Sequence, residues 1–355
     1  MEAPVEPAQD AANFRRMRNQ EMPMEMRTFG RTGLRISILG FGCGAVGGLM
    51  VRGAPADQER AIARALEAGV NYFDTAVQYG NGESEKNLGR ALKKLKPKDA
   101  IVGTKVRLTA AEFGGIADAV TKSLEGSLRR LGMERVDIFH LHNVITVNGV
   151  GESLGVGQVL HQLVPAFERL RQKGMIRFLG ITAAGDTAAL HQVVDARVVD
   201  SAQVIYNMLN PSAGKPLPER YPAQDYGLLL DRAHKAGVGV IGIRVLAGGA
   251  LSGSAERHPI ASPPPEPIGS ATSYEGDLER ARRLLPLVDE GSAESLAEAA
   301  IRFAIAHPEV GTILVGMATP GQFEQALSAV QRGPLPRAAL DQLSALQQGF
   351  AGEAR

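Results

Sequence analysis

Four side chains that can carry protons follow three consecutive segments with the pattern of buried strands. They are Asp74 and Tyr79 after Asn71–Phe73, Lys105 near the end of Ala100–Val106, and His142 at the end of Val136–His142. The carboxyl ends of the strands of a parallel barrel surround one mouth. We therefore expect strand order, rather than distance along the chain, to bring these four side chains together.

The chemistry of such a group is control of a tyrosine pKa. A free tyrosine has a pKa of about 10 and is a poor acid–base catalyst near neutral pH. A lysine ammonium beside it favours the phenolate and lowers that pKa. An aspartate would hold the lysine in place, and a histidine would orient a substrate oxygen. The group could then protonate a carbonyl oxygen while hydride reaches the carbon, or run the reverse reaction.

Each residue also has a purely structural interpretation. Lys105 and Asp74 could be a structural ion pair, and Tyr79 could be a loop tyrosine that packs on the barrel rim. His142 could be a structural histidine whose ring nitrogens are hydrogen-bonded within the protein. The neighbouring His140 is expected to be structural because strand alternation would point it elsewhere. Taken together, the four residue types at three successive strand ends favour a role in proton transfer over a purely structural one.

The elements that would position these residues alternate regularly from Met26 onward. Short, continuous apolar segments alternate with segments of helical periodicity, which predicts a parallel sheet buried on both faces. Eight strand-like segments favour closure into an α/β (β/α)8 barrel, with an open doubly wound sheet as the alternative. Arg27–Gly30 and Leu34–Ile38 flank a turn at 31–33, which predicts an N-terminal hairpin.

Three connections are longer than usual and all follow strands, so we expect them on the C-terminal face of the barrel. They are Asn143–Gly157, Met208–Asp225 and the proline-rich Leu251–Tyr274. Residues 1–25 are polar and are expected to form a flexible leader. Residues 26–350 are expected to form a single barrel domain.

Composition limits the classes of partner. The formal net charge is +1, so no strong field would recruit nucleic acid or an acidic membrane. No apolar run approaches the length of a membrane span, and the start lacks the apolar core of a signal peptide. The single cysteine, Cys43, excludes an intrachain disulfide and fits a cytoplasmic setting. We predict no metal site, and oligomeric state is left open.

Two motifs suggest other functions. Residues 42–47 match G-x-G-x-x-G, but the glycines that follow oppose the immediate helix that a dinucleotide fold requires. A glycine-rich barrel loop is the better interpretation. Residues 151–155 match the serine-hydrolase pattern G-x-S-x-G around Ser153, but glycines interrupt the required strand and helix. We keep the hydrolase as a minor alternative and expect a loop.

Three blocks of the sequence resemble the aldo-keto reductase family. They are Phe73-Asp-Thr-Ala-Val-Gln-Tyr-Gly-Asn-Gly-Glu-Ser-Glu-Lys-Asn-Leu-Gly89, Gly103-Thr-Lys105 and Val136-Asp-Ile-Phe-His-Leu-His142. The similarity begins at Arg27 and reaches the 320s. The resemblance implies a (β/α)8 barrel that binds NADP(H) at its C-terminal mouth. It implies Tyr79 as the acid–base residue, supported by Lys105, Asp74 and His142.

The resemblance also implies a set of cofactor residues. They are Gly42 and Cys43 after the first strand, Thr182 and Gln203 at the nicotinamide carboxamide, Arg244, Leu246 and Gly248 at the pyrophosphate, and Gly316, Thr319 and Gln322 at the adenosine 2′-phosphate. Ala183 stands where the family has a carboxamide-binding Asn, and Ile243 where many relatives have a tyrosine. Thr319 replaces a basic residue, so selection for NADP(H) over NAD(H) is expected to be weak.

The expected function is reduction of an aldehyde or ketone, or oxidation of the alcohol, with a small molecule as the partner. A family aromatic on the substrate side is absent, because Gly44 follows Cys43. Substrate identity is therefore not implied. The alternative is a nicotinamide-binding barrel that serves as a regulatory or interaction subunit with little turnover.

Overall fold

A computed structural model describes residues 23–353, so all but the last three residues of the expected leader lie outside the described residues. Eight strands close into a barrel in the order β10-β11-β12-β3-β4-β5-β6-β9, and every neighbouring pair is parallel. Their bounds are β3 Leu39–Gly42, β4 Tyr72–Asp74, β5 Ile101–Val106, β6 Val136–Leu141, β9 Ile176–Ala183, β10 Ser201–Ile205, β11 Gly239–Ile243 and β12 Val310–Gly316. The predicted (β/α)8 barrel is confirmed.

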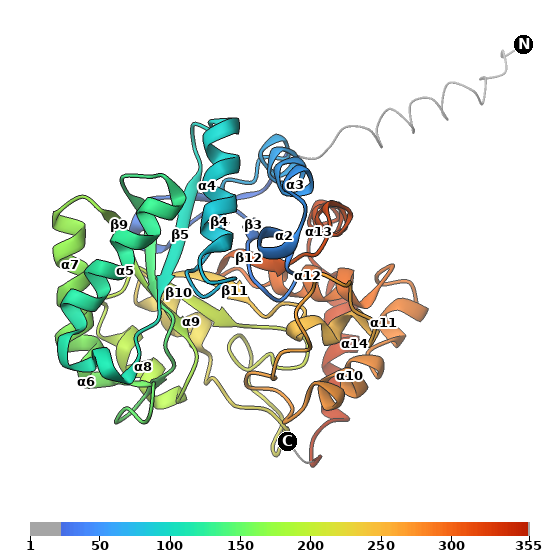
Figure 1. The fold of residues 1–355 in the computed structure, drawn as a ribbon. Coiled ribbons are helices and arrows are strands. Elements are labelled where there is room, and N and C mark those ends of the chain that lie inside the picture. The colour runs from blue at the N-terminus through green and yellow to red at the C-terminus, as the bar shows by residue number, and fades with distance from the viewer. Residues whose placement is uncertain (1–22, 354–355) are drawn as a thin grey trace, which may run out of the picture.

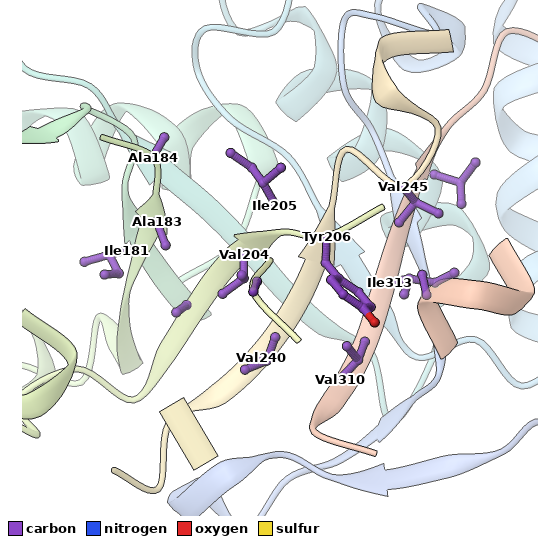
Figure 2. Packing of buried hydrophobic residues seen from close by; sticks show 14 of the residues in the cluster. Ile181, Ala183, Ala184, Val204, Ile205, Tyr206, Val240, Val245, Val310 and Ile313 are labelled. Atoms are coloured by element: carbon purple, nitrogen blue, oxygen red, sulfur yellow. The ribbon is translucent and has the colours of Figure 1, made fainter. Parts of the chain in front are cut away.

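Helices follow the strands and lie outside the ring that the strands form (Figure 1). The principal ones are α3 Pro55–Glu67, α4 Glu83–Leu95, α5 Ile116–Leu131, α7 Val164–Gln172, α8 Thr187–Asp195, α9 Leu229–Lys235, α12 Leu296–Ala306, α13 Pro320–Gln331 and α14 Arg337–Gln348. Their apolar faces cover outward side chains of the strands. Figure 2 shows part of this packing, including Val204, Val240 and Ile313 from three neighbouring strands. None of the described helices meets the length and hydropathy needed to span a membrane.

A second, smaller core fills the inside of the barrel. The predicted hairpin forms from β1 Met26–Thr28 and β2 Arg35–Ser37, which pair antiparallel. Phe29 and Ile36 of this hairpin are fully buried with Tyr72, Ile101, Ile138 and Ile241 of the barrel strands. The hairpin therefore closes the N-terminal end of the barrel, which leaves the opposite end for a site.

Strand alternation decides which side chains face that interior. Tyr72 and Ile101 belong to the inner core, so Asp74 and Lys105, two and four residues further along their strands, face inward as well. The expectation that alternation turns His140 away from His142 is wrong, because residues two apart share a face. His140 is fully buried, and its Nε2 lies 3.1 Å from Ser201 Oγ. That contact supports the structural role expected for it.

The last of the three long connections runs from the end of a 3-10 segment, Ala247–Ser252, to helix α10 Tyr274–Arg282, and its residues 253–273 form neither helix nor strand. Helix α10 and the following α11 Pro286–Asp289 were not predicted. Helix α10 is strongly polar, so its apolar periodicity is weak, but Ser273 caps it by accepting from Gly276 N. The first long connection contains the short strands β7 Ile145–Thr146 and β8 Leu154–Gly155.

Candidate active site

Lys105 is the centre of the group at the mouth of the barrel. Its side chain is completely buried, and its Nζ forms an ion pair with Asp74 Oδ1. The same ammonium donates to the carbonyl oxygen of Thr75 at 2.9 Å and lies 3.2 Å from the Tyr79 hydroxyl. Burial lowers the pKa of Lys105, but Asp74 and Tyr79 raise it, and the net shift is upward. Lys105 is therefore a cation at neutral pH.

Tyr79 lies in the loop between β4 and α4, as the sequence predicts. Lys105 lowers the pKa of Tyr79 as expected, but burial raises it more and Asp74 adds to the rise, so the net shift is upward. Tyr79 is thus a neutral phenol that can give up a proton, with an ammonium 3.2 Å away to stabilise the phenolate that remains.

His142 completes the group on the other side of Tyr79. The two rings meet edge to face, with their centroids 5.8 Å apart and their planes at 88°. His142 Nδ1 lies 3.3 Å from Gln78 Oε1, a neighbour that the sequence analysis did not single out. Burial, then the charges of Lys105 and Arg107, lower the pKa of His142 to about 3. The imidazole is therefore neutral near pH 7.

This pKa predicts the acid side of the pH profile. Because a neutral imidazole is favoured down to a pKa of about 3, His142 should not titrate between about pH 5 and 8. We therefore expect that kcat for carbonyl reduction does not fall around pH 6.5, where an ordinary histidine would gain a proton. The measurement is kcat against pH for the wild type and for His142→Gln. A step near 6.5 that disappears in His142→Gln would contradict this electrostatic picture.

Asp74 receives more donors than the sequence predicts. Gln203, expected to bind a carboxamide, donates from Nε2 to Asp74 Oδ2 at 2.7 Å. Tyr72 donates from its hydroxyl to the same oxygen at 2.8 Å. The sequence analysis missed Tyr72, although its position two residues before Asp74 puts it on the same face of β4.

Thr182 has a buried hydroxyl that is available to a ligand. Its Oγ1 is buried, and it is one of the few buried side-chain polar atoms of the described residues without a hydrogen-bond partner. A buried hydroxyl without a partner is unfavourable, so Thr182 fits an external polar ligand. Thr182 pairs with Gln203 in register across β9 and β10, so the two expected carboxamide residues are adjacent.

Gly42 ends β3, and Cys43 follows it at the same mouth. Gly42 pairs with Asp74 across β3 and β4, and Cys43 N donates to Asp74 O at 2.9 Å. Burial raises the pKa of the Cys43 thiol, so this sulfur is not a nucleophile at neutral pH. Among the described residues beyond its chain neighbours, a Cβ added to Gly44 would meet only the Tyr79 ring, at 4.0 Å. A Cβ at this position would therefore have no close contact.

Arg244, Leu246 and Gly248 follow β11 in a turn of unusual backbone geometry. Gly248 and Gly249 have φ of +70° and +112°, which favour glycine. Arg244 Nη1 donates to Glu266 O at 3.2 Å, and in the described part of the chain the guanidinium forms no ion pair with an acidic residue. Burial lowers its pKa. A half-buried cation of this kind suits an anionic ligand.

Gly316 ends β12, and Thr319 and Gln322 follow at the start of α13. Thr319 caps this helix by accepting from Gln322 N at 3.2 Å. Gln322 Oε1 accepts from Ala318 N at 2.7 Å. Both side chains are therefore engaged locally, and neither carries the positive charge that usually holds a phosphate dianion.

The two alternative motifs do not form the sites that their patterns suggest. Ser153 Oγ donates to Val150 O and lies 3.0 Å from Thr146 Oγ1, so the side chain stabilises a turn. The preceding strand, β7, ends at Thr146, so no strand runs directly into Ser153 as a nucleophile elbow requires. The glycines at 42–47 end β3 and enter a turn, and only the four-residue helix α2 Leu49–Arg52 follows directly.

Comparison with known proteins identifies the family to which the chain is similar. The model of the Aldo/keto reductase family matches residues 38–348. L-galactose dehydrogenase of Arabidopsis thaliana is 32% identical over 313 residues, covering 86% of this chain and 88% of that protein. Pyridoxal 4-dehydrogenase of Microbacterium luteolum is 26% identical and covers 85% and 91%. The solved aldo-keto reductase AKR11C1 of Bacillus halodurans, in its holo form, superposes with a TM-score of 0.66 at 24% identity, covering 94% and 98%.

Proposed function

The chain belongs to the aldo/keto reductase family of nicotinamide-dependent oxidoreductases, and from this premise we propose that Tyr79 is its acid–base residue in the interconversion of a carbonyl compound and an alcohol. The observation that carries the proposal is the Tyr79 hydroxyl 3.2 Å from the buried Lys105 ammonium. Asp74 holds that ammonium, and His142 lies at the edge of the tyrosine ring.

The residues at the mouth suit a bound nicotinamide dinucleotide, which would supply or accept the hydride. The unpartnered Thr182 Oγ1 would hold the carboxamide, and Gln203 would assist with its carbonyl oxygen, since its amide nitrogen serves Asp74. Arg244 and the turn at Gly248 would hold the pyrophosphate. Thr319 and Gln322 would lie at the adenosine ribose.

In reduction, Tyr79 would donate its phenolic proton to the carbonyl oxygen. Lys105 would stabilise the phenolate that this transfer leaves, because a cation 3.2 Å away favours the charged form. Neutral His142 would orient the substrate oxygen toward the phenol. In alcohol oxidation, the Tyr79 phenolate would accept the proton. The position of Gly44, where a Cβ would have no close contact among the described residues, supports a substrate that reaches Tyr79 from that side.

Removal of the Thr182 hydroxyl should weaken cofactor binding. Thr182→Val keeps the shape of the side chain and removes a hydroxyl that has no partner in the protein. A hydrogen bond contributes about 1 kcal/mol, so we expect the Kd for NADPH to rise about fivefold. Fluorescence titration measures this without turnover. Thr312→Val is the matched control, because Thr312 Oγ1 is also buried and unpartnered but lies outside the proposed site; equal effects in both variants would refute the role of Thr182.

We propose NADP(H) as the cofactor, with NAD(H) also accepted. Tight selection for the 2′-phosphate would need a clamp of positive charge, and Thr319 and Gln322 supply none. Titration with NADPH and NADH side by side tests this directly. Kd values within about tenfold of each other, or about 1.4 kcal/mol, agree with the proposal. A much larger preference for either cofactor would refute it.

A panel of aldehydes and ketones tests the function as a whole. We expect reduction of at least one member by NADPH, and loss of that activity in Tyr79→Phe. A regulatory subunit would bind the cofactor and reduce nothing in the panel. The cytoplasmic setting remains a prediction from cysteine usage.

A further inference from the structure

The Asp74 carboxylate is held from three sides. Lys105 binds Oδ1, and two neutral donors, Tyr72 and Gln203, converge on Oδ2 at 2.8 and 2.7 Å. All of these groups are inside the barrel, below Tyr79. The two neutral donors fix the plane of the carboxylate, so that its other oxygen faces the ammonium.

The Tyr72 hydroxyl is the less expected of the two donors. Tyr72 is completely buried within the inner apolar core, where a phenylalanine would fill almost the same volume. Burying an extra hydroxyl is costly unless it has a partner. The neighbouring strand provides the space, because a Cβ on Gly103 would lie 2.7 Å from this hydroxyl oxygen. Both features agree with a hydroxyl kept for its bond to Asp74.

The direction of that bond follows from charge. Burial, and then the nearby Asp74 carboxylate, raise the pKa of Tyr72 well above its usual value. The phenol therefore keeps its proton and donates it. A substitution of Gln203 cannot test the effect of a donor to Asp74 alone, because Gln203 is also a proposed cofactor residue. Tyr72 is shielded from any ligand by its burial.

We propose that Tyr72 is a positioning residue, which acts through Asp74 on Lys105 and thereby sets the acidity of Tyr79. The inference rests on the proposed function of Tyr79. The Tyr72 hydroxyl donates to Asp74 Oδ2 and so holds Asp74 Oδ1 toward Lys105. Loss of the hydroxyl frees the carboxylate to turn, and the Lys105 ammonium is then held less firmly beside Tyr79. Tyr79 becomes a weaker acid for that reason.

The test uses Tyr72→Phe in the full-length protein. We expect kcat for carbonyl reduction to fall about fivefold at neutral pH and the alkaline limb of its pH profile to move to higher pH, since a weaker acid transfers its proton more slowly. The Kd for NADPH, measured by fluorescence, should not change. Tyr221→Phe is the control. It removes another buried tyrosine hydroxyl, which donates to Leu209 O at 3.0 Å and not to Asp74, and it should leave kcat unchanged.

The same substitution in a Lys105→Met background completes the test. If Tyr72 acts through Asp74 on Lys105, Tyr72→Phe has no further effect on single-turnover rates once the ammonium is gone. An unchanged kcat in Tyr72→Phe overturns the inference, and so does an equal loss with and without Lys105. Neither result affects the role of Tyr79. Full turnover in Tyr79→Phe would instead refute the proposed function itself.

Discussion

Tyr79→Phe should lower kcat for carbonyl reduction by a factor on the order of 10²–10⁴, the usual contribution of a positioned acid–base group. The substitution removes the hydroxyl that lies 3.2 Å from Lys105 Nζ and keeps the ring that meets His142 edge to face. Packing should therefore be preserved, and the loss should be confined to the chemical step. Stopped-flow single turnover with NADPH measures that step.

Two controls accompany this variant. Its Kd for NADPH should equal that of the wild type, because the proposed cofactor contacts come from other residues. Tyr221→Phe, which removes a tyrosine hydroxyl bonded to Leu209 O rather than to a residue of the site, should keep full activity. If Tyr79→Phe retains more than about a tenth of the wild-type rate, the phenol is not the principal proton donor.

Lys105→Met should cause a loss on the order of 10²–10³-fold in kcat and should also destabilise the fold. The ammonium contacts Asp74, Thr75 and Tyr79, and its side chain is fully buried. Its removal withdraws the charge that stabilises the Tyr79 phenolate. It also leaves the Asp74 carboxylate buried without its cation, which costs about 3–5 kcal/mol. Single-turnover rates and thermal melts measure the two losses.

Adding Asp74→Asn separates these two losses. The double variant removes both charges, so its melting temperature should recover toward the wild-type value. Its rate should stay as low as that of Lys105→Met, because the phenol still lacks its cation. Recovery of rate together with stability would mean that the pair serves only the fold.

The sequence predicts the fold well because the pattern of the barrel is local. Most strands, such as β5, are short segments rich in apolar residues, and most helices have one apolar face, so the observed bounds differ from the predicted ones by only a few residues. Helix α10 lacked this signal because most of its residues are polar. The serine at 273, a residue type that often caps helices, was the one sequence feature that indicated the start of this helix. His140 lies two residues after Ile138 of the inner core, so strand alternation turns it inward as well.

The site is predictable in part. Residue types at strand ends place Asp74, Lys105, Tyr79 and His142 at one mouth, and the structure brings them together. Sequence cannot give the net pKa of Tyr79, because burial and Asp74 oppose Lys105 and the outcome depends on distances in three dimensions. The bond from Gln203 to Asp74 is equally inaccessible, since it spans the inside of the barrel between residues 129 positions apart.

The most direct test of the account is the titration of the Tyr79 phenol itself. The ¹³C resonance of its Cζ atom, assigned by its absence in Tyr79→Phe, can be followed by nuclear magnetic resonance to high pH in the wild type and in Lys105→Met. If the Lys105 ammonium stabilises the phenolate, the phenol ionises at a higher pH once the ammonium is removed. An equal or lower ionisation pH in Lys105→Met would show that the cation does not act on this tyrosine.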